Sequence, residues 1–456
     1  MSRLPYLIVL IIIVGIVSPY WFSYGMFMDG LIYSTVSMNL HQGLGSFWDP
    51  SFTPYLHPHF HEHPPLGMFI QSGLYSISNS PLIDRWYSII TLLLSGWALT
   101  KIWSFLQPDQ KQLGYWPLLF WGTTPLVIWA LPNNLLENLM GLWVLLAILF
   151  QWKSFRENNW KLSISVGLLW TLSFYTKGPV GLFPIALGPI LWLLQLEGRA
   201  IIFKQFSISL ITALILFFAP YFLNATIQLS WDAYFHQQIG NSLRNVVTVQ
   251  SRFYILFQTF NHAIPTLAFI IIGWLYGRKK IQLHFDKKVI AVFLLGLSGI
   301  VPMMISLKQR EFYLLPAWPL IILALSLMAE SILKNIHEHG LLIPKKWGIG
   351  IAFILFVVAC SVALKFSGTC VRDSKTQLDL VKIAQHFPEH NTFHITQELH
   401  EDYSLIGYAF RYYQIALDPF EHKDCIITTS VNNATLVEYQ EVPLDLQRLH
   451  VFIRKN

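Results

Sequence analysis

Acidic and basic side chains stand beside long apolar segments at several points of this chain. They are Asp29, Glu62, Arg85, Glu137, Lys177, Lys308 and Arg310. A charge at the centre of a membrane costs about 2.5–3.5 kcal/mol, so charges kept near apolar segments usually serve a function. A carboxylate can accept a proton from a hydroxyl, and lysine or arginine can stabilise negative charge on a bound anion. The simpler alternatives are a helix cap for Asp29 and interfacial anchoring for the basic residues.

The elements that must position these side chains are membrane-spanning helices. Apolar residues make up 54% of the chain and charged residues 12%, whereas soluble domains contain about 25% charged residues. Apolar runs of about 17–23 residues recur between Leu7 and Phe366, each long enough to cross a hydrocarbon layer of about 30 Å. The composition therefore predicts an α-helical polytopic membrane protein.

About 11 spans are expected from the apolar runs. They cover residues 7–22, 86–106, 114–131, 135–152, 161–176, 179–196, 205–224, 253–277, 289–307, 311–333 and 347–366. The apolar segment 65–77, of about 13 residues, is expected to be interfacial or re-entrant because it is too short to span. If it did span, the two sides of the membrane would be exchanged for everything after it.

Basic residues gather in segments between the spans, and the positive-inside rule places these segments in the cytoplasm. They include Lys153, Arg156, Arg199, Lys204, Arg278, Lys279, Lys280, Lys287 and Lys288. Residues 25–64 contain no lysine or arginine and are therefore expected outside. The basic residues do not form the stripe with interleaved aromatic residues that is typical of a nucleic-acid interface, so no nucleic-acid partner is expected.

The predicted domains are a transmembrane domain of residues 1–366 and a small exoplasmic α/β domain of residues 367–456. Residues 24–85 form the first outer loop, with juxtamembrane helices. The tail is more polar and has helical periodicity at 378–387. Its β-branched runs lie at 392–396, 426–429 and 449–453.

Short motifs along roughly residues 1 to 330 share their order and spacing with a known family. They are Asp29, Gly30 and Tyr33 after the first span, Glu62-His63-Pro64, Glu137, Thr176-Lys177-Gly178, and Lys308 to Pro316. Together they resemble the motifs of bacterial GT-C glycosyltransferases of the protein mannosyltransferase and lipid A aminoarabinose transferase type. The resemblance implies transfer of a sugar from a polyprenyl phosphate at the periplasmic face of the inner membrane. It leaves open whether the acceptor is a lipid, a glycan or a protein.

The resemblance also implies roles for individual residues. Asp29 is expected to be the general base, with Glu137 and Glu62 as supporting acids. The residues expected at the donor phosphate are Tyr33, His63, Arg85, Lys177, Lys308 and Arg310. One base without a separate nucleophile predicts a single displacement with inversion. The chain departs from the family pattern at Gly30, Ile32 and His63, so the sugar cannot be carried over from any one member.

A divalent metal, zinc or magnesium or manganese, is a further hypothesis for the first loop. His57, His59, His61 and His63 would share one face of an extended chain. Related aminoarabinose transferases are thought to bind a metal near the glutamate that Glu62 matches. The other candidate ligands are His61 and His236, with His262 as an alternative to His236. The alternative is a solvated histidine-rich loop.

The cysteines offer one disulfide. Cys360 lies in the last span, whereas Cys370 and Cys425 lie in the outer domain, where an oxidising compartment permits a bridge. Closing a loop of about 55 residues would stabilise the small domain by roughly 4 kcal/mol.

A rival function is a transporter or a flippase for lipid-linked sugars, which would also gather charge among spans. Transporters usually show paired inverted halves with broken helices near the membrane centre. This sequence shows no internal repeat, and its charges gather at one predicted face. The sequence therefore favours the glycosyltransferase.

Overall fold

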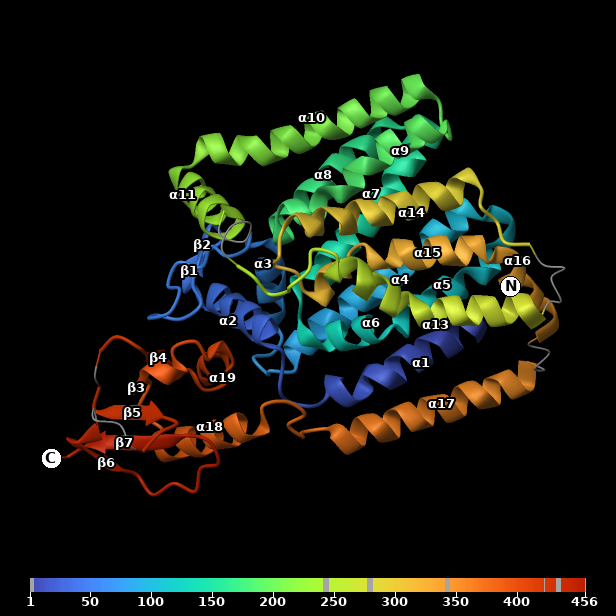
Figure 1. Cartoon of the computed structure of the whole chain (residues 1–456). Coiled ribbons are helices and arrows are strands. Elements are labelled where there is room, and N and C mark those ends of the chain that lie inside the picture. The colour runs from blue at the N-terminus through green and yellow to red at the C-terminus, as the bar shows by residue number, and fades with distance from the viewer. Residues whose placement is uncertain are drawn as a thin grey trace.

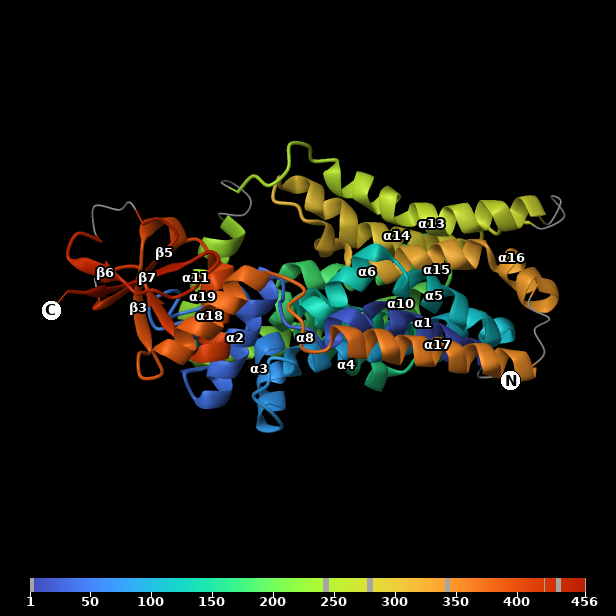
Figure 2. The ribbon, with the colours of Figure 1, turned by 90° about the horizontal axis from the view of Figure 1, so that it is seen from below.

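The computed structural model describes residues 4–240, 246–276, 282–340, 345–421, 423–431 and 436–455. Arg278, Lys279 and Lys280, which support the predicted topology, lie outside the described residues. The helices form a long body, and a small α/β domain lies at one end of it, as Figures 1 and 2 show from two directions. The same end carries α2 (Met28–Gln42) and the hairpin of β1 (Gly45–Ser46) and β2 (Asp49–Pro50).

Within the described residues, seven helices are long and apolar enough to cross a membrane. They are α1 (Leu4–Trp21), α4 (Ile83–Leu106), α7 (Leu136–Glu157), α10 (Arg199–Leu223), α13 (Tyr254–Tyr276), α14 (Lys287–Ile300) with η6 (Val301–Ile305), and α17 (Lys345–Phe366). Large apolar side chains on α10 and α13 are exposed, such as Phe222 and Ile272. A lipid environment accommodates such a surface, and the polytopic helical fold is confirmed.

The remaining predicted spans consist of shorter or more polar pieces. These are α5 (Tyr115–Gly122) with α6 (Pro125–Ala130), α8 (Trp160–Lys177), η4 (Pro179–Ala186) with α9 (Leu187–Leu194), and α15 (Trp318–Met328) with α16 (Glu330–Asn335). The last pair is bent by 70° and counts as an eighth span if it is taken as one. By length and composition the described chain thus has seven or eight such helices, and the shorter pieces lie where the other predicted spans were expected. The predicted span 114–131 is interrupted because α6 begins at Pro125, which cannot continue α5.

Short helical pieces connect these elements. They are α3 (Leu66–Ser72), η1 (Gly73–Ser76), η2 (Pro108–Gly114), η3 (Leu131–Asn133), α11 (Ala225–Ala233), η5 (Tyr234–Gly240), η7 (Glu311–Leu314), η8 (Ile336–Gly340) and η9 (Gln397–Leu399). The short apolar segment of the first loop forms α3 and η1, and neither is long enough to span.

The helix α2 is buried almost throughout. Every residue from Gly30 to Asn39 is buried. The helix ends at Gly43, which has φ of 76° and donates its N–H to the carbonyls of Asn39 and Leu40. A glycine adopts this left-handed conformation without strain, so it stops the helix at this point. This juxtamembrane helix is therefore packed inside the protein and does not lie on the lipid surface.

The carboxyl-terminal domain follows α17 directly. Its elements are α18 (Ser374–His386), β3 (Thr392–Ile395), α19 (Tyr403–Tyr413), β4 (Ala416–Asp418), β5 (Cys425–Thr428), β6 (Tyr439–Glu441) and β7 (His450–Arg454). The sheet has the order β4-β3-β5-β7-β6, with β3 parallel to β4 and β5, and β7 antiparallel to β5 and β6. Its apolar core is continuous with α2 through side chains such as Leu31 and Val36.

The predicted disulfide between Cys370 and Cys425 is wrong, because all three cysteines are free. Cys370 forms a backbone bridge with Tyr24 just after α1, and its thiol lies 3.7 Å from Gln377 Oε1. Cys425 begins β5 and pairs with Ile453 of β7. The first cysteine thus sits at the junction with the helical body, and the second sits inside the sheet.

Candidate active site

Asp29 lies in the first turn of α2, where the helix dipole favours a negative charge. The neighbouring loop holds this turn tightly. Asn133 Oδ1 accepts a hydrogen bond of 2.9 Å from the Phe27 N–H, and Asn134 Nδ2 donates one of 3.2 Å to the Gly30 carbonyl. A Cβ atom at Gly30 would overlap the Asn133 carbonyl oxygen, so only glycine fits there. This close approach accounts for the glycine at position 30, where the chain departs from the motif.

Lys177 and Glu137 form a buried ion pair of 2.5 Å, with side chains 7% and 1% exposed. Lys177 ends α8, and Glu137 lies in the first turn of α7. Three aromatic rings surround the ammonium group, at 5.9 Å for Tyr33, 5.7 Å for Phe312 and 5.6 Å for Tyr313. An aromatic face attracts an ammonium group, so the three rings help to hold Lys177 in place.

The helix break after Lys177 depends on Gly178. Its φ is +84°, and a Cβ atom there would overlap the Tyr234 hydroxyl. Its N–H donates to the Phe174 carbonyl and closes the last turn of α8. Pro179 then begins η4, so the lysine is presented at the end of a helix where a positive charge is favourable.

A cavity of about 360 Å³ opens in front of this ion pair and is called the first cavity here. Its polar lining residues are Glu62, His63, Glu137, Lys177, Lys308 and Tyr313. Its other walls are mostly apolar and come from η4 and from the segment after α14, with Phe183, Met303 and Ile305 among them. A cavity with cations on one side and apolar walls elsewhere suits a molecule with an anionic head and a hydrocarbon chain.

The Asp29 carboxylate lies among positive charges without pairing to any of them. Within the described residues, no hydrogen bond or ion pair engages it. Burial raises the pKa of Asp29 above its usual value, and the charges of Lys177, Arg310 and Lys308 oppose that rise. A carboxylate with a raised pKa and free oxygens is suited to accept a proton.

Glu62 and His63 both line the first cavity, and burial shifts their pKa values in opposite directions. Burial raises the pKa of Glu62; nearby His57 and Lys308 oppose the rise, and Asp29 adds to it. Burial lowers the pKa of His63 well below its usual range, with Lys177 and Lys308 adding to the effect. His63 is therefore neutral at pH 7 and adds no positive charge to the first cavity.

A second cavity of about 500 Å³ is lined by the residues that follow Lys308, from Gln309 to Phe312. Its lining includes Phe27, Trp129, Tyr254, His262, Arg310 and Phe312. Arg310 therefore belongs to this second cavity, whereas Lys308 belongs to the first. Tyr254 donates to Glu311 Oε1 at 3.0 Å, and His262 lies 3.5 Å from Glu311 Oε2.

Arg85 lines neither cavity. It is 3% exposed and donates to the carbonyl oxygens of Pro132 and Gly25. It thus braces the two backbone segments beside α2. Arg85 is therefore not placed to contact a donor phosphate in either cavity, contrary to the prediction.

The histidines of the first loop do not share a face. His57 has φ of +51°, which breaks the extended conformation that the sequence predicted. His61 lies 3.4 Å from Asp49 and 3.2 Å from Ser230 Oγ, and His236 is exposed. Within the described residues, no three histidine, cysteine, aspartate or glutamate side chains are placed to hold a metal ion. The residues around Glu62 therefore do not fit a metal centre.

Two contributors to the site were not predicted from the sequence. Phe312, one of the rings around Lys177, lies inside the Lys308–Pro316 motif but was not assigned a role. Tyr234 lines the first cavity, and no local pattern marks it. Only the close packing against Gly178 shows where this tyrosine lies.

Part of the chain matches a known protein family, and most of its length is similar in fold to solved structures. Residues 62–223 match the family of dolichyl-phosphate-mannose-protein mannosyltransferases. The fold is similar to ArnT from Cupriavidus metallidurans without ligand, with a TM-score of 0.67, 14% identity, and 98% of this chain and 97% of that chain covered. For the same protein bound to undecaprenyl phosphate, the TM-score is 0.62 at 15% identity, with 98% and 97% covered.

A third similar structure is the oligosaccharyltransferase AglB from Archaeoglobus fulgidus with an inhibitory peptide and a dolichol-phosphate. It has a TM-score of 0.51 and 8% identity, with 93% of this chain and 69% of that chain covered. No curated protein sequence matches the chain. The chain therefore has a fold similar to that of ArnT and AglB, and the family match over residues 62–223 agrees with the resemblance seen in its motifs.

Proposed function

We propose that this protein is a glycosyltransferase of the GT-C type that moves a sugar from a polyprenyl phosphate to an acceptor at the outer face of a bacterial inner membrane, with Asp29 as the general base. The observation that carries the proposal is the first cavity. It places Lys177 and Lys308 beside largely apolar walls. The lipid chain would occupy the apolar part, and the two lysines would face the phosphate. ArnT has been crystallised with undecaprenyl phosphate, which supports this donor class.

The second cavity offers a separate entry for the acceptor. One segment contributes to both cavities, because Lys308 lines the first and Arg310 lines the second. Asp29 itself lines neither cavity, but the rise in its pKa caused by burial is opposed both by Lys308, which lines the first, and by Arg310, which lines the second. An acceptor hydroxyl that enters from the second cavity would meet Asp29 and the sugar carbon together. Bringing the reactants together in this way supplies much of the rate of such reactions.

The reaction is a single displacement. Asp29 accepts the proton of the acceptor hydroxyl, and the oxygen forms a bond to the anomeric carbon. The bond from that carbon to the phosphate oxygen breaks, and its electron pair stays on the polyprenyl phosphate. Lys177 and Lys308 stabilise the charge that develops there, in a site whose low dielectric strengthens their effect. The sugar carbon is inverted, because no second nucleophile takes part.

The glutamates have supporting roles in this mechanism. Glu137 fixes the Lys177 ammonium group through their buried ion pair. Glu62 lies close enough to Lys308 to affect its protonation, because burial lowers the pKa of that lysine while Glu62 opposes the shift. Both carboxylates thus hold cations that face the leaving group. Acceptors of several kinds fit this chemistry, namely a lipid, a glycan or a protein hydroxyl.

The test uses the purified full-length protein and a panel of undecaprenyl-phosphate-linked sugars with candidate acceptors. The expected result is release of undecaprenyl phosphate from at least one donor, with inverted configuration in the product. A transporter would leave every donor intact. Retention of configuration would show that a covalent intermediate forms and that the single displacement is wrong.

A further inference from the structure

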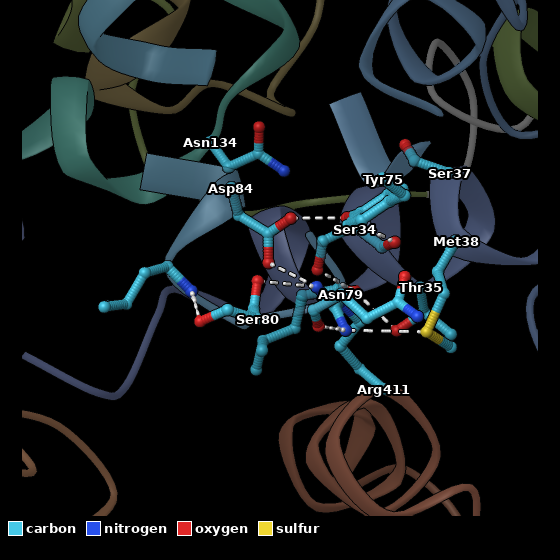
Figure 3. A network of polar contacts seen from close by, with 12 residues as sticks. Ser34, Thr35, Ser37, Met38, Tyr75, Asn79, Ser80, Asp84, Asn134 and Arg411 are labelled. Atoms are coloured by element: carbon cyan, nitrogen blue, oxygen red, sulfur yellow. Dashed lines mark hydrogen bonds and ion pairs between the residues drawn. The ribbon is translucent and has the colours of Figure 1, made fainter. Parts of the chain in front are cut away.

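A buried ion pair joins the carboxyl-terminal domain to the start of α4, as Figure 3 shows. Arg411 of α19 places Nη2 3.5 Å from Oδ2 of Asp84, and the two side chains are 2% and 1% exposed. The guanidinium also donates to the carbonyl oxygens of Asn79 at 3.2 Å and Ser80 at 3.3 Å, and it stacks 4.8 Å from the Tyr75 ring. These contacts engage Nη1 and Nη2, whereas the buried Nε has no hydrogen-bond partner among the described residues.

The ion pair continues as a chain of hydrogen bonds to the turn that holds Asp29. Oδ1 of Asp84 accepts from Gln71 Nε2 at 2.8 Å. Gln71 Oε1 in turn accepts from Asn134 Nδ2 at 3.1 Å. The same amide of Asn134 donates to the Gly30 carbonyl at 3.2 Å. An unbroken path therefore leads from a side chain of the outer domain to the residue next to Asp29.

Other contacts fix α2 to the same domain. The Tyr408 hydroxyl of α19 accepts from the Met26 N–H at 2.9 Å, just before α2 begins. A Cβ atom at Gly407 would lie 3.1 Å from the Leu31 Cβ, so α19 packs closely against α2. The Tyr75 hydroxyl contacts Asp84 and lies 3.1 Å from the Ser34 carbonyl, one turn further along α2. The catalytic helix is thus held between the helical body and the outer domain.

We propose that the carboxyl-terminal domain positions the catalytic base: Arg411, through Asp84, Gln71 and Asn134, fixes the first turn of α2 and with it the Asp29 carboxylate. Arg411 touches no substrate in this arrangement and is a positioning residue. The inference rests on the proposed role of Asp29. It explains why a charged network is buried at a junction that apolar side chains could have filled, since hydrogen bonds fix distances and angles that apolar packing leaves looser.

The test compares three variants of the full-length protein with the wild type. Arg411→Met removes the arginine but leaves Asp84 buried without its charge partner, which destabilises the fold. Asp84→Leu/Arg411→Met removes both charges, so stability should be largely recovered while the hydrogen-bond path stays broken. Arg454→Met is the matched control, because Arg454 is an exposed arginine of the same domain whose side chain pairs, within the described residues, with the exposed Glu438.

The measurements are kcat and KM with a donor that the wild type uses, binding of undecaprenyl phosphate, and thermal unfolding. The double variant should fold and bind undecaprenyl phosphate like the wild type, yet its kcat should fall on the order of 10²-fold because the base is displaced. The apparent pKa of its kcat should also move down towards that of an ordinary aspartate, since a loosened α2 exposes Asp29 to water. Arg454→Met should match the wild type throughout.

A stable double variant with wild-type kcat would overturn the proposal. A loss of kcat that only parallels a loss of donor binding and thermal stability would also overturn it, because the ion pair would then only stabilise the attachment of the outer domain. The proposed function is checked separately by Asp29→Asn. If that variant keeps its activity, Asp29 is not the base, whatever Arg411 does.

Discussion

Gly30→Ala should give a protein that still folds but holds Asp29 in the wrong position. The added Cβ atom would overlap the Asn133 carbonyl oxygen and lie 2.8 Å from Met26 Sδ. The overlap is with backbone, so α2 and the 131–134 loop must separate by on the order of 1 Å to restore an ordinary contact. Overpacking of this kind destabilises by about 1–3 kcal/mol. A displacement of about 1 Å at a reacting group reduces turnover on the order of 10²-fold.

Gly73→Ala is the matched control. Gly73 follows α3 with an ordinary helical φ of −61°, and a Cβ atom there would meet nothing within 4 Å. Its stability and kcat should therefore equal those of the wild type. The assay is release of undecaprenyl phosphate at saturating donor, together with thermal unfolding of each variant. If Gly30→Ala is destabilised as expected but keeps the wild-type kcat, the position of the first turn of α2 does not limit the reaction.

Other properties follow from the same geometry. Lys177→Met should lower kcat by about 10²–10³ and destabilise the protein by about 3–5 kcal/mol, since it leaves Glu137 buried without a partner; a wild-type kcat would assign the lysine to structure alone. Because burial raises the pKa of Asp29, the base is lost as pH falls at a higher pH than for an ordinary aspartate of about 3.9. A pH profile of kcat should show this acidic limb, and a limb at or below that value would argue against Asp29. Dialysis against EDTA should leave turnover intact, because the described residues form no metal site; loss that zinc or manganese restores would contradict this.

Much of the candidate site could be predicted because its residues lie in short motifs. Lys177 sits between a threonine and Gly-Pro, and this local pattern forces a helix to end with the lysine exposed to a cavity. Asp29 begins a helix just after a span, which is also a local feature. The order of such motifs along the chain was enough to indicate which membrane enzyme fold brings them together.

The predictions that were wrong concern features that depend on tertiary contacts. Arg85 opens a helix as an anion-binding residue would, yet its donors meet the carbonyls of Pro132 and Gly25 from other parts of the chain. The histidine loop looked extended from its prolines, but His57 adopts a left-handed conformation. The span predicted for residues 114–131 was based on apolar length alone, and the structure divides it into α5 and α6.

The network around Arg411 also lay beyond sequence reasoning. The arginine is more than 300 residues from Asp84 along the chain, and its own helix α19 looks like an ordinary amphipathic helix of a small domain. Only the packing of α19 against α2 brings the two charges together.

The central claim is tested most directly by Asp29→Asn, measured beside Asp109→Asn, which changes an exposed aspartate in the connection after α4. Donor binding is followed with undecaprenyl phosphate, and turnover with a sugar-loaded donor and its acceptor. Removing a general base costs about 10²–10⁴ in rate. Asp29→Asn should therefore bind undecaprenyl phosphate normally and lose turnover by that factor, while Asp109→Asn behaves as the wild type. Transfer by Asp29→Asn at close to the wild-type rate would contradict the account.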